Sequence, residues 1–258
     1  MIKNPIIIAS RNDLAGMNIV ENLKKLGCKT KIEIIEGDLI TAENIDKKYQ
    51  TDFIIFASRH KSEKETKTLS VHSIGNFNDA KFGGKPGTLC LSNALINKVF
   101  FKKLNEIAKK ENSDYELTME ATHHGPCIET PSLFIEIGST EKQWKDKKAG
   151  KIIAETIINS VNEKLEDCKI AFGIGGPHYC PSFNKIQLGD KIAISHVISA
   201  YSFPLTDKII EETVSKTKEK VDFVLLDWKG LGNAESRNNI LDILKKFNLK
   251  ILKTKDLH

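Results

Sequence analysis

Residues 53–57 form an unbroken apolar run, Phe-Ile-Ile-Phe-Ala, which restricts the fold more than any other segment. A strand with one face in water alternates apolar and polar side chains, so a run without alternation indicates a strand covered on both faces, as in a parallel sheet. Residues 6–9 form a similar run, and a segment with helical character follows them and ends at Gly27. Strands that alternate with helices predict an α/β fold with a mixed, largely parallel sheet flanked by helices.

The composition fits one domain of this kind. The chain has 258 residues, of which 40% are hydrophobic and 28% charged, so we expect a single α/β domain over residues 1–258. No apolar run approaches the roughly 20 residues that span a bilayer, and we expect a cytoplasmic monomer without membrane contact. Further strands are predicted at 31–36, 69–72, 117–121, 133–138, 169–173, 191–196, 221–226 and 250–253, and helices at 93–110, 147–165, 209–220 and 236–247.

Five cysteines lie scattered along the chain without a CxxC pair or a zinc-finger spacing. This pattern is typical of a reducing compartment. Only Cys127 and Cys180 fall within histidine-rich motifs, and we interpret both as packed thiols.

The sequence Glu120-Ala-Thr-His-His-Gly-Pro126 places one carboxylate and two imidazoles within five residues. On a helical turn, Glu120, His123 and His124 would share one face, within reach of one metal ion or one water molecule. The segment 117–121 has strand character, however, so these side chains are expected where a strand enters a loop, as part of a composite site. Ionisable side chains this dense have no obvious packing use, which favours catalytic roles.

Four more histidines lie at or near predicted strand ends, where the active loops of open α/β sheets gather. His60 follows the strand 53–57, and His72 ends the strand 69–72. His178 lies in a glycine-rich motif that presents it to a ligand, although a structural histidine in a tight turn fits the same pattern. His196 ends the strand 191–196 and either completes the site or belongs to the core.

Lysines supply most of the net charge of +5 and make the middle of the chain basic. Such a cluster either tracks a phosphate backbone or forms the solvated face of two helices, and both interpretations stay open. The loop 78–88 either contacts phosphate through Lys81 and Lys85 or is a plain linker, and it is no Walker loop because Pro86 follows its Gly-Lys. The clustered positions are Lys102, Lys103, Lys109, Lys110, Lys142, Lys145, Lys147, Lys148 and Lys151.

Five motifs, taken in order, resemble the archaeal and plant type of D-aminoacyl-tRNA deacylase. They are Ser58-Arg-His60, Leu69-Ser-Val-His72 with Gly75-Asn76, Glu120-Ala-Thr-His-His-Gly-Pro126, Gly173-Ile-Gly-Gly-Pro-His-Tyr-Cys-Pro181 and Asp227-Trp-Lys-Gly230. The resemblance covers nearly the whole chain, and the ordered set is far more specific than any one motif. The family's glycine-rich motif commonly reads Gly-Gly-Gly-His-Tyr-Ala-Pro, so Pro177 and Cys180 depart from it, and we expect small local changes without loss of chemistry.

The resemblance implies hydrolysis of the ester that joins a D-amino acid, such as D-tyrosine, to the terminal ribose of tRNA. It also implies a zinc-containing enzyme whose fold is related to peptidyl-tRNA hydrolase and to the phosphorylase-like group. The alternatives are a peptidyl-tRNA hydrolase, a phosphorylase-like enzyme, or a non-catalytic tRNA-binding protein whose histidines are structural.

Ester hydrolysis needs an activated water and a group that holds the developing oxyanion. Zinc on neutral histidines supplies both, and either two zinc ions or one zinc ion beside an acid–base histidine fits. The metal-free alternative uses Glu120 or a histidine as the base, with the backbone amides of Gly175 and Gly176 as an oxyanion pocket. The expected catalytic residues are Glu120, His123, His124 and His178, and the expected metal ligands are His60, His72, His123, His178 and His196.

Binding of tRNA is expected to fall to cations near the motifs, because RNA helices are recognised mainly by shape and phosphate contact. Together with Gly175 and Gly176, the expected substrate-binding residues are Arg59, Lys145, Lys147, Lys148, Lys229 and Arg237.

Overall fold

A six-stranded mixed sheet forms the main body of the protein in the computed structural model, which describes residues 1–189 and 191–257. All neighbouring strands pair in parallel except β4 and β8, which are antiparallel. The strands lie in the order β2 (Lys31–Ile35), β1 (Pro5–Ser10), β3 (Phe53–Lys61), β8 (Ser132–Ser139), β4 (Thr68–His72) and β7 (Glu116–Met119).

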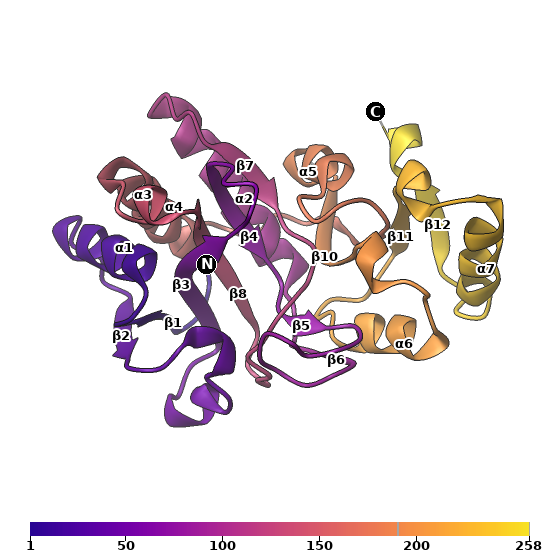
Figure 1. Cartoon of the computed structure of the whole chain (residues 1–258), viewed down its shortest axis with the longest axis horizontal. Coiled ribbons are helices and arrows are strands. Elements are labelled where there is room, and N and C mark those ends of the chain that lie inside the picture. The colour runs from indigo at the N-terminus through magenta and orange to yellow at the C-terminus, as the bar shows by residue number, and fades with distance from the viewer. Residues whose placement is uncertain (190, 258) are drawn as a thin grey trace.

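A second sheet of four parallel strands lies beside the first (Figure 1). A short two-stranded ribbon, β5 (Gly75–Asn76) with β6 (Thr88–Leu89), flanks the glycine-rich loop 77–87. The four strands lie in the order β10 (Ile192–Ile198), β9 (Lys169–Ile174), β11 (Phe223–Leu226) and β12 (Lys250–Lys253).

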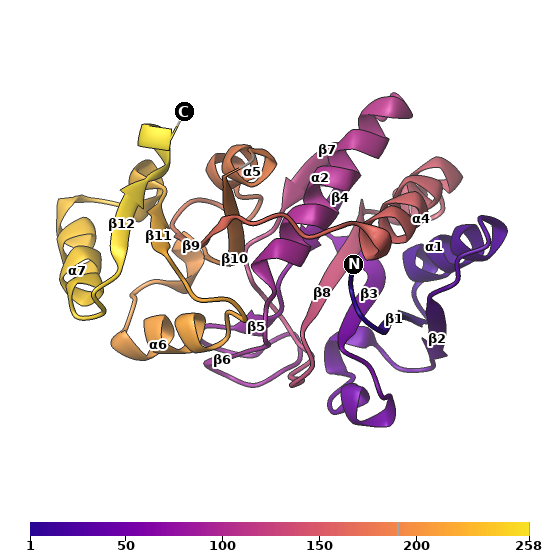
Figure 2. The same cartoon turned by 180° about the vertical axis from the view of Figure 1, so that it is seen from behind.

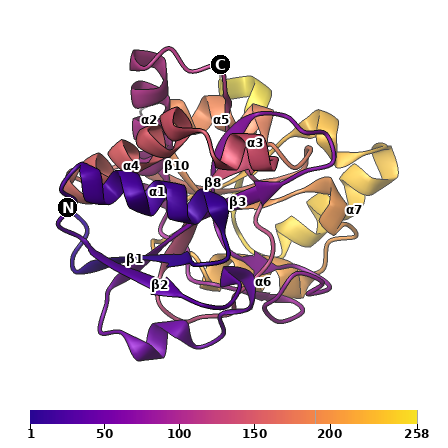
Figure 3. The ribbon, with the colours of Figure 1, turned by 60° about the vertical axis from the view of Figure 1, so that its left-hand side comes forward.

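Helices cover one face of the main sheet, as Figure 3 shows for α1, α2 and α4. The opposite face packs against the short turns Leu39–Thr41 and Ile45–Lys48. Residues 53, 55 and 57 of β3 pack in the core beneath the helices, and residues 54 and 56 pack in the core on the opposite face. The unbroken apolar run is therefore buried on both faces, as predicted. The helices are α1 (Leu14–Lys25), α2 (Ala94–Lys110), α3 (Glu141–Trp144), α4 (Lys147–Asn162), α5 (Pro181–Leu188), α6 (Asp207–Ser215) and α7 (Ala234–Lys245).

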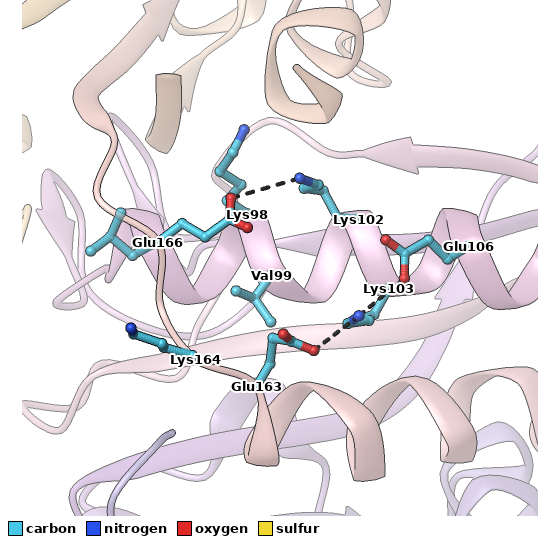
Figure 4. A pocket seen from close by; sticks show the side chains of 9 residues that line it. Lys98, Val99, Lys102, Lys103, Glu106, Glu163, Lys164 and Glu166 are labelled. Atoms are coloured by element: carbon cyan, nitrogen blue, oxygen red, sulfur yellow. Dashed lines mark hydrogen bonds and ion pairs between the residues drawn. The ribbon is translucent and has the colours of Figure 1, made fainter. Parts of the chain in front are cut away.

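Helix α2 packs against both sheets, and Figure 2 shows it between them from behind. Its Lys98 is buried, and the ammonium group donates to the carbonyl oxygens of Gln187 at 2.7 Å and Ile192 at 2.8 Å, and also to that of Gly189. Figure 4 shows the neighbouring surface, where Lys102 and Lys103 of the basic region pair with Glu166 and Glu163.

Capping side chains tie the helices to the strands. Asp13 begins α1 by accepting from the amide of Gly16 at 2.9 Å, and its other oxygen accepts from the Ser58 hydroxyl and the Arg59 amide at the end of β3. The start of α1 is therefore fixed to the strand that delivers His60.

The predicted α/β class with a largely parallel sheet is confirmed, and most elements lie where the sequence predicts them. The predicted helix 209–220 is wrong at its end, because α6 finishes at Ser215 and Thr217 pairs with Ser92 in an isolated bridge. Strand β7 ends at Met119, so Glu120 follows it. Among the described residues, no helix combines the length and apolar character needed to cross a membrane. The single domain over 1–258 stays a prediction.

Candidate active site

A cleft of about 850 Å³ lies at the carboxyl ends of β1, β3 and β8 and extends over the face of the main sheet opposite α1, α2 and α4. Side chains alternate along strands, so His60 of β3, Glu136 of β8 and His72 of β4 share this face with Phe134. The cleft is lined by His60, His123, His124, His178 and Glu136, while Glu120 and His72 are buried.

The strands reach the site from two directions. His60 pairs in register with Gly138, whereas β4 runs antiparallel and brings His72 opposite Phe134, further down the sheet. His60 and His72 therefore lie on one face of the sheet but at different levels along it, because β3 runs parallel to β8 and β4 runs antiparallel to it. Glycine is needed at position 138, because a Cβ there would lie 3.0 Å from His60 Cδ2 and 2.3 Å from the Thr68 hydroxyl.

Glu120 is the centre of the cluster. Its Oε2 atom lies 2.9 Å from His178 Nε2, 3.2 Å from His60 Nδ1 and 3.6 Å from His123 Nε2. The Oε1 atom is buried without a hydrogen-bond partner in the described chain, which leaves one carboxylate oxygen open to a water molecule or a metal ion.

Burial and neighbouring charges set the protonation of these groups. Burial opposes ionisation of Glu120, but hydrogen bonds from His178 and His60 outweigh it and hold the pKa of this carboxyl well below its usual value. Burial would lower the pKa of His60, yet Glu120 and then Glu136 raise it to about 9. Burial raises the pKa of Glu136 itself, with Glu120 adding to the increase. At neutral pH the cluster thus holds a carboxylate beside a protonated imidazole.

A second group consists of His72, His123 and His124, each of which offers a ligand atom within 4.8 Å of the others. The Nδ1 atoms lie 3.0, 2.8 and 2.6 Å from the carbonyl oxygens of Ser73, Ala121 and Gly125 respectively. A carbonyl only accepts, so each Nδ1 carries a proton, and Nε2 keeps its lone pair wherever the imidazole is neutral.

The same group differs in charge among its members. Burial lowers the pKa of His123 well below its usual value and that of His124 to about 3, with the charge of His72 adding to both effects. Burial also acts on His72, but Glu136, whose Oε2 lies 3.5 Å from His72 Nε2, outweighs it and raises the pKa. His123 and His124 are therefore neutral and can donate a lone pair to a metal ion, whereas His72 would have to lose a proton before it could bind one.

Three residues that the sequence interpretation missed complete the geometry. Glu136 is the one carboxylate in an otherwise apolar strand, which is a signal that the sequence does contain. Tyr179 lies with its hydroxyl 3.1 Å from His60 Nε2, and only its place next to His178 could have indicated it. Trp144 also holds His60, because its indole N–H donates to the His60 carbonyl at 3.0 Å.

The segment that carries Glu120 joins the two sheets. The amide of Glu120 donates to Val71 at 3.2 Å, on the main sheet. The next two amides, those of Ala121 and Thr122, donate to His178 at 2.8 Å and Val197 at 2.9 Å, on the side of the second sheet. His178 therefore reaches Glu120 across the contact between the sheets.

His196 and the two expected oxyanion donors lie outside this arrangement. His196 is fully buried, and its Nδ1 and Nε2 atoms lie 3.1 Å from the Thr122 hydroxyl and from the Lys216 carbonyl, so neither nitrogen faces the cleft residues. The amides of Gly175 and Gly176 donate to the carbonyls of Ile198 and Gly230 at 2.8 and 3.4 Å. These glycines instead allow close packing, since a Cβ on Gly176 would lie 2.8 Å from Asp227 Oδ2.

The expected tRNA-binding cations divide into three places. Arg59 lines the cleft, where its guanidinium lies 5.7 Å from the Trp144 ring and donates to the Asn12 carbonyl. The second place is the end of α3 and the start of α4, where Lys145 pairs with Glu141, Lys147 pairs with Glu21, and Lys148 donates to the Asn112 carbonyl.

The third place surrounds Trp228, next to Lys229 and to the Asp227 that packs against the glycine-rich motif. Arg237 and Lys253 lie over the Trp228 ring at 5.2 and 3.9 Å.

Buried carboxylates joined to several imidazoles at the floor of a cleft are the equipment of enzymes that attack substrates with water, by acid–base or metal-assisted chemistry. The fold and the site therefore define an α/β protein of the hydrolase kind. Residues 47–252 match the family model described as D-aminoacyl-tRNA deacylase. The chain belongs to this family, which confirms the resemblance and the expected class of enzyme.

Curated relatives cover almost the full length. A D-aminoacyl-tRNA deacylase of Pyrococcus furiosus is 36% identical, over 98% of this chain and 93% of the relative. Another of Thermococcus onnurineus is 34% identical, over 96% and 99%. The crystal structure of a conserved protein of unknown function, AF0625, superposes with a TM-score of 0.90 at 31% identity, covering 98% of this chain and 95% of that one.

Proposed function

We propose that this protein hydrolyses the ester bond of D-aminoacyl-tRNA and releases the free D-amino acid and tRNA. The observation that carries the proposal is the cluster around Glu120: His178, His60 and His123 line an open cleft and surround this buried carboxylate. The family's name and the substrates named for its curated members supply the bond to be cleaved.

The chain's own groups support general acid–base chemistry. Glu120 is ionised and has one free oxygen, so it accepts the proton of an attacking water. His60 holds a proton at neutral pH and lies in contact with Glu120 and Tyr179, so it donates to the departing ribose oxygen. His178 lines the cleft and bonds to Glu120, which keeps the carboxylate oriented.

A zinc ion fits His72, His123 and His124 by the chemistry of their donors. Their Nδ1 atoms are tied to backbone carbonyls, which is the usual outer-shell support of a metal-binding histidine, and His72 Nε2 is buried without a hydrogen-bond partner in the described chain. When bound, the ion supplies Lewis-acid polarisation of the ester carbonyl and a more acidic water. The group of His60, Glu120 and His178 offers a second set of ligand atoms within 4.8 Å, so two ions per chain is the alternative stoichiometry.

The cleft-lining Arg59 and the cations around Trp228 support contact with the tRNA acceptor end. Two classes of alternative remain: an enzyme that prefers N-acyl-aminoacyl-tRNA, and a protein that binds tRNA without turnover.

The test measures release of tyrosine from D-tyrosyl-tRNA and L-tyrosyl-tRNA by the whole protein, with and without exhaustive chelation, together with N-acetyl-tyrosyl-tRNA as the rival substrate. We expect preference for the D ester, and at least a hundredfold loss of turnover with retained tRNA binding in Glu120→Gln, on the order of magnitude of a lost general base.

Zinc analysis of the same samples separates the metal proposal from the reaction. His124→Ala should lower the bound zinc, and full activity after removal of all metal would overturn the metal assignment alone. Faster cleavage of the N-acetyl ester, or tRNA binding with no turnover of any ester, would overturn the proposed reaction.

A further inference from the structure

An apolar side chain stands exposed at the edge of the candidate active site. Phe82 lines the same cleft as His123, His124 and His178, and 67% of its surface is open to solvent. Single exposed apolar residues are common on proteins. What distinguishes Phe82 is that its backbone is held rigidly beside the residues of the site.

Hydrogen bonds fix the loop that carries Phe82. The Phe82 carbonyl accepts from the amide of Gly125, the residue after His124, at 3.0 Å. The Asn76 side chain donates to the Gly83 carbonyl at 2.9 Å. The Glu43 carboxylate accepts from the amide of Gly84 at 3.1 Å and also from the amide of Cys127 on the far side of the motif.

Glycines let three backbone segments touch at this point. A Cβ on Gly83 would lie 1.8 Å from the Ile40 carbonyl oxygen, and a Cβ on Gly125 would lie 2.2 Å from the Gly84 nitrogen. Side chains are excluded from these contacts, so the Phe82 loop, the turn at Ile40 and the His123-His124 motif form one unit. The phenyl ring is presented to the cleft by a backbone that has little freedom.

A rigid aromatic ring suits a flat and constant part of the substrate. Unpaired bases at RNA ends are recognised by stacking on aromatic side chains. The terminal adenosine carries the ester in every aminoacyl-tRNA, whereas the amino acid varies. Leu39 and Ile40 extend the apolar wall beside Phe82. Arg59 lines the same cleft, and its guanidinium, which lies 3.7 Å from Asp38 Oδ1, supplies a cation for the phosphate of that nucleotide.

We propose that Phe82 stacks on the terminal adenine of the tRNA and so positions the ester over the Glu120 cluster. This inference rests on the proposed function and adds the part of the substrate that the cleft recognises.

The test compares D-tyrosyl-tRNA that ends in adenosine with D-tyrosyl-tRNA whose terminal nucleotide lacks the base. Phe82→Ala should raise KM about tenfold on the normal substrate with little change in kcat, since base stacking on aromatics has this magnitude. Phe82→Trp should restore KM, and Phe82→Leu, which keeps apolar bulk without an aromatic face, should not. On the abasic substrate the four proteins should have equal KM values.

Two controls test whether the effect belongs to the Phe82 ring. Tyr201 is 79% exposed and does not line the cleft, so Tyr201→Ala should leave KM for a D-tyrosyl-adenosine minimal substrate unchanged. Adenosine monophosphate, compared with ribose 5-phosphate, should change the fluorescence of the indole added in Phe82→Trp, a readout that does not depend on turnover.

A KM defect in Phe82→Ala that persists on the abasic substrate would overturn the proposal. If that defect disappears when D-alanine replaces D-tyrosine, the ring contacts the amino-acid side chain instead. Failure of the wild-type protein to cleave D-tyrosyl-tRNA would refute the proposed function, while adenosine monophosphate binding would still report on the adenine site.

Discussion

Glu136 controls how firmly His60 keeps its proton. It lies 3.7 Å from His60 Nδ1 and contributes, after Glu120, to raising the pKa of this imidazole to about 9. A group with a raised pKa is charged below that value and loses its proton as pH rises through it. Donation by His60 should therefore fail on the alkaline side.

This gives a prediction for the pH profile. The value of kcat/KM should fall as pH rises through about 9. Glu136→Gln should move this alkaline limb to lower pH, because it removes a negative charge that favours the protonated imidazole. Glu141→Gln is the matched control, since Glu141 lines the same cleft but does not act on His60.

Zinc content should be measured in each of these variants, because Glu136 also lies close to His72. An alkaline limb that stays in place or moves to higher pH in Glu136→Gln would count against His60 as the proton donor.

At the scale of elements, the glycine-rich turn after β9 positions His178 by packing against the loop that begins at Asp227. Gly176 has a φ of +81°, and a Cβ there would lie 2.8 Å from Asp227 Oδ2. The amide of Gly176 also donates to the Gly230 carbonyl. The two motifs therefore fix each other, and His178 depends on both.

Gly176→Ala should reduce stability by roughly 1–2 kcal/mol, because an L side chain in the left-handed region carries that cost, and it should lower kcat by displacing His178. Thermal unfolding and turnover of D-tyrosyl-tRNA measure the two effects. Gly37→Ala is the control, since no atom lies within 4 Å of its added Cβ and its φ is not in the left-handed region. Equal behaviour of the two variants would show that the turn does not position His178.

The positions of most strands and helices can be predicted from the sequence, but the direction of neighbouring strands and the packing between elements cannot. Apolar periodicity locates α2 closely and finds the start of β3, because each buries a face of its own. The predicted end of the strand at residue 57 is wrong, since β3 continues to Lys61 and His60 lies within it and not after it. The direction of β4 cannot be read from its residues, since an antiparallel and a parallel neighbour bury the same side chains. Because β4 is antiparallel to β8, its carboxyl end brings His72 beside Phe134 near the start of β8, and not beside the carboxyl ends of the parallel strands.

Side-chain bonding is hidden from the sequence for a similar reason. His196 and His178 are both expected at or just past the ends of buried strands. In the structure His196 lies within β10 and turns toward Thr122 and Lys216, whereas His178 follows β9 and turns toward Glu120. Only the packing of the two sheets separates a core histidine from one that faces a cleft.

At the scale of the whole molecule, the surface cations differ in how freely they can bind phosphate. Lys145 and Lys147 are balanced by Glu141 and Glu21, and Lys148 donates to the Asn112 carbonyl. Arg237 and Lys253 instead rest on the Trp228 ring. A phosphate group must compete with a carboxylate for Lys145 and Lys147, but it meets no such competitor at the cations that lie over the Trp228 ring.

Replacing Lys229, Arg237 and Lys253 by glutamine should therefore weaken tRNA binding more than replacing Lys145, Lys147 and Lys148. The slope of log Kd against log salt should fall by about 0.7–0.9 for each phosphate that the variant no longer neutralises. Binding of uncharged tRNA at several salt concentrations measures this, with unfolding midpoints as the check on folding. An unchanged slope in both triple variants would remove these surfaces from the tRNA interface.

The peptide from Glu120 to Thr122 passes its hydrogen bonds from one sheet to the other within three residues. The side chains of the site are thus divided between the main sheet and the second sheet, and neither sheet carries all of them. Partial unfolding of the second sheet would withdraw His178 and silence the site while the main sheet stayed intact. Turnover of substrate is therefore a measure of tertiary structure, because only molecules in which the two sheets are packed together hold the complete site.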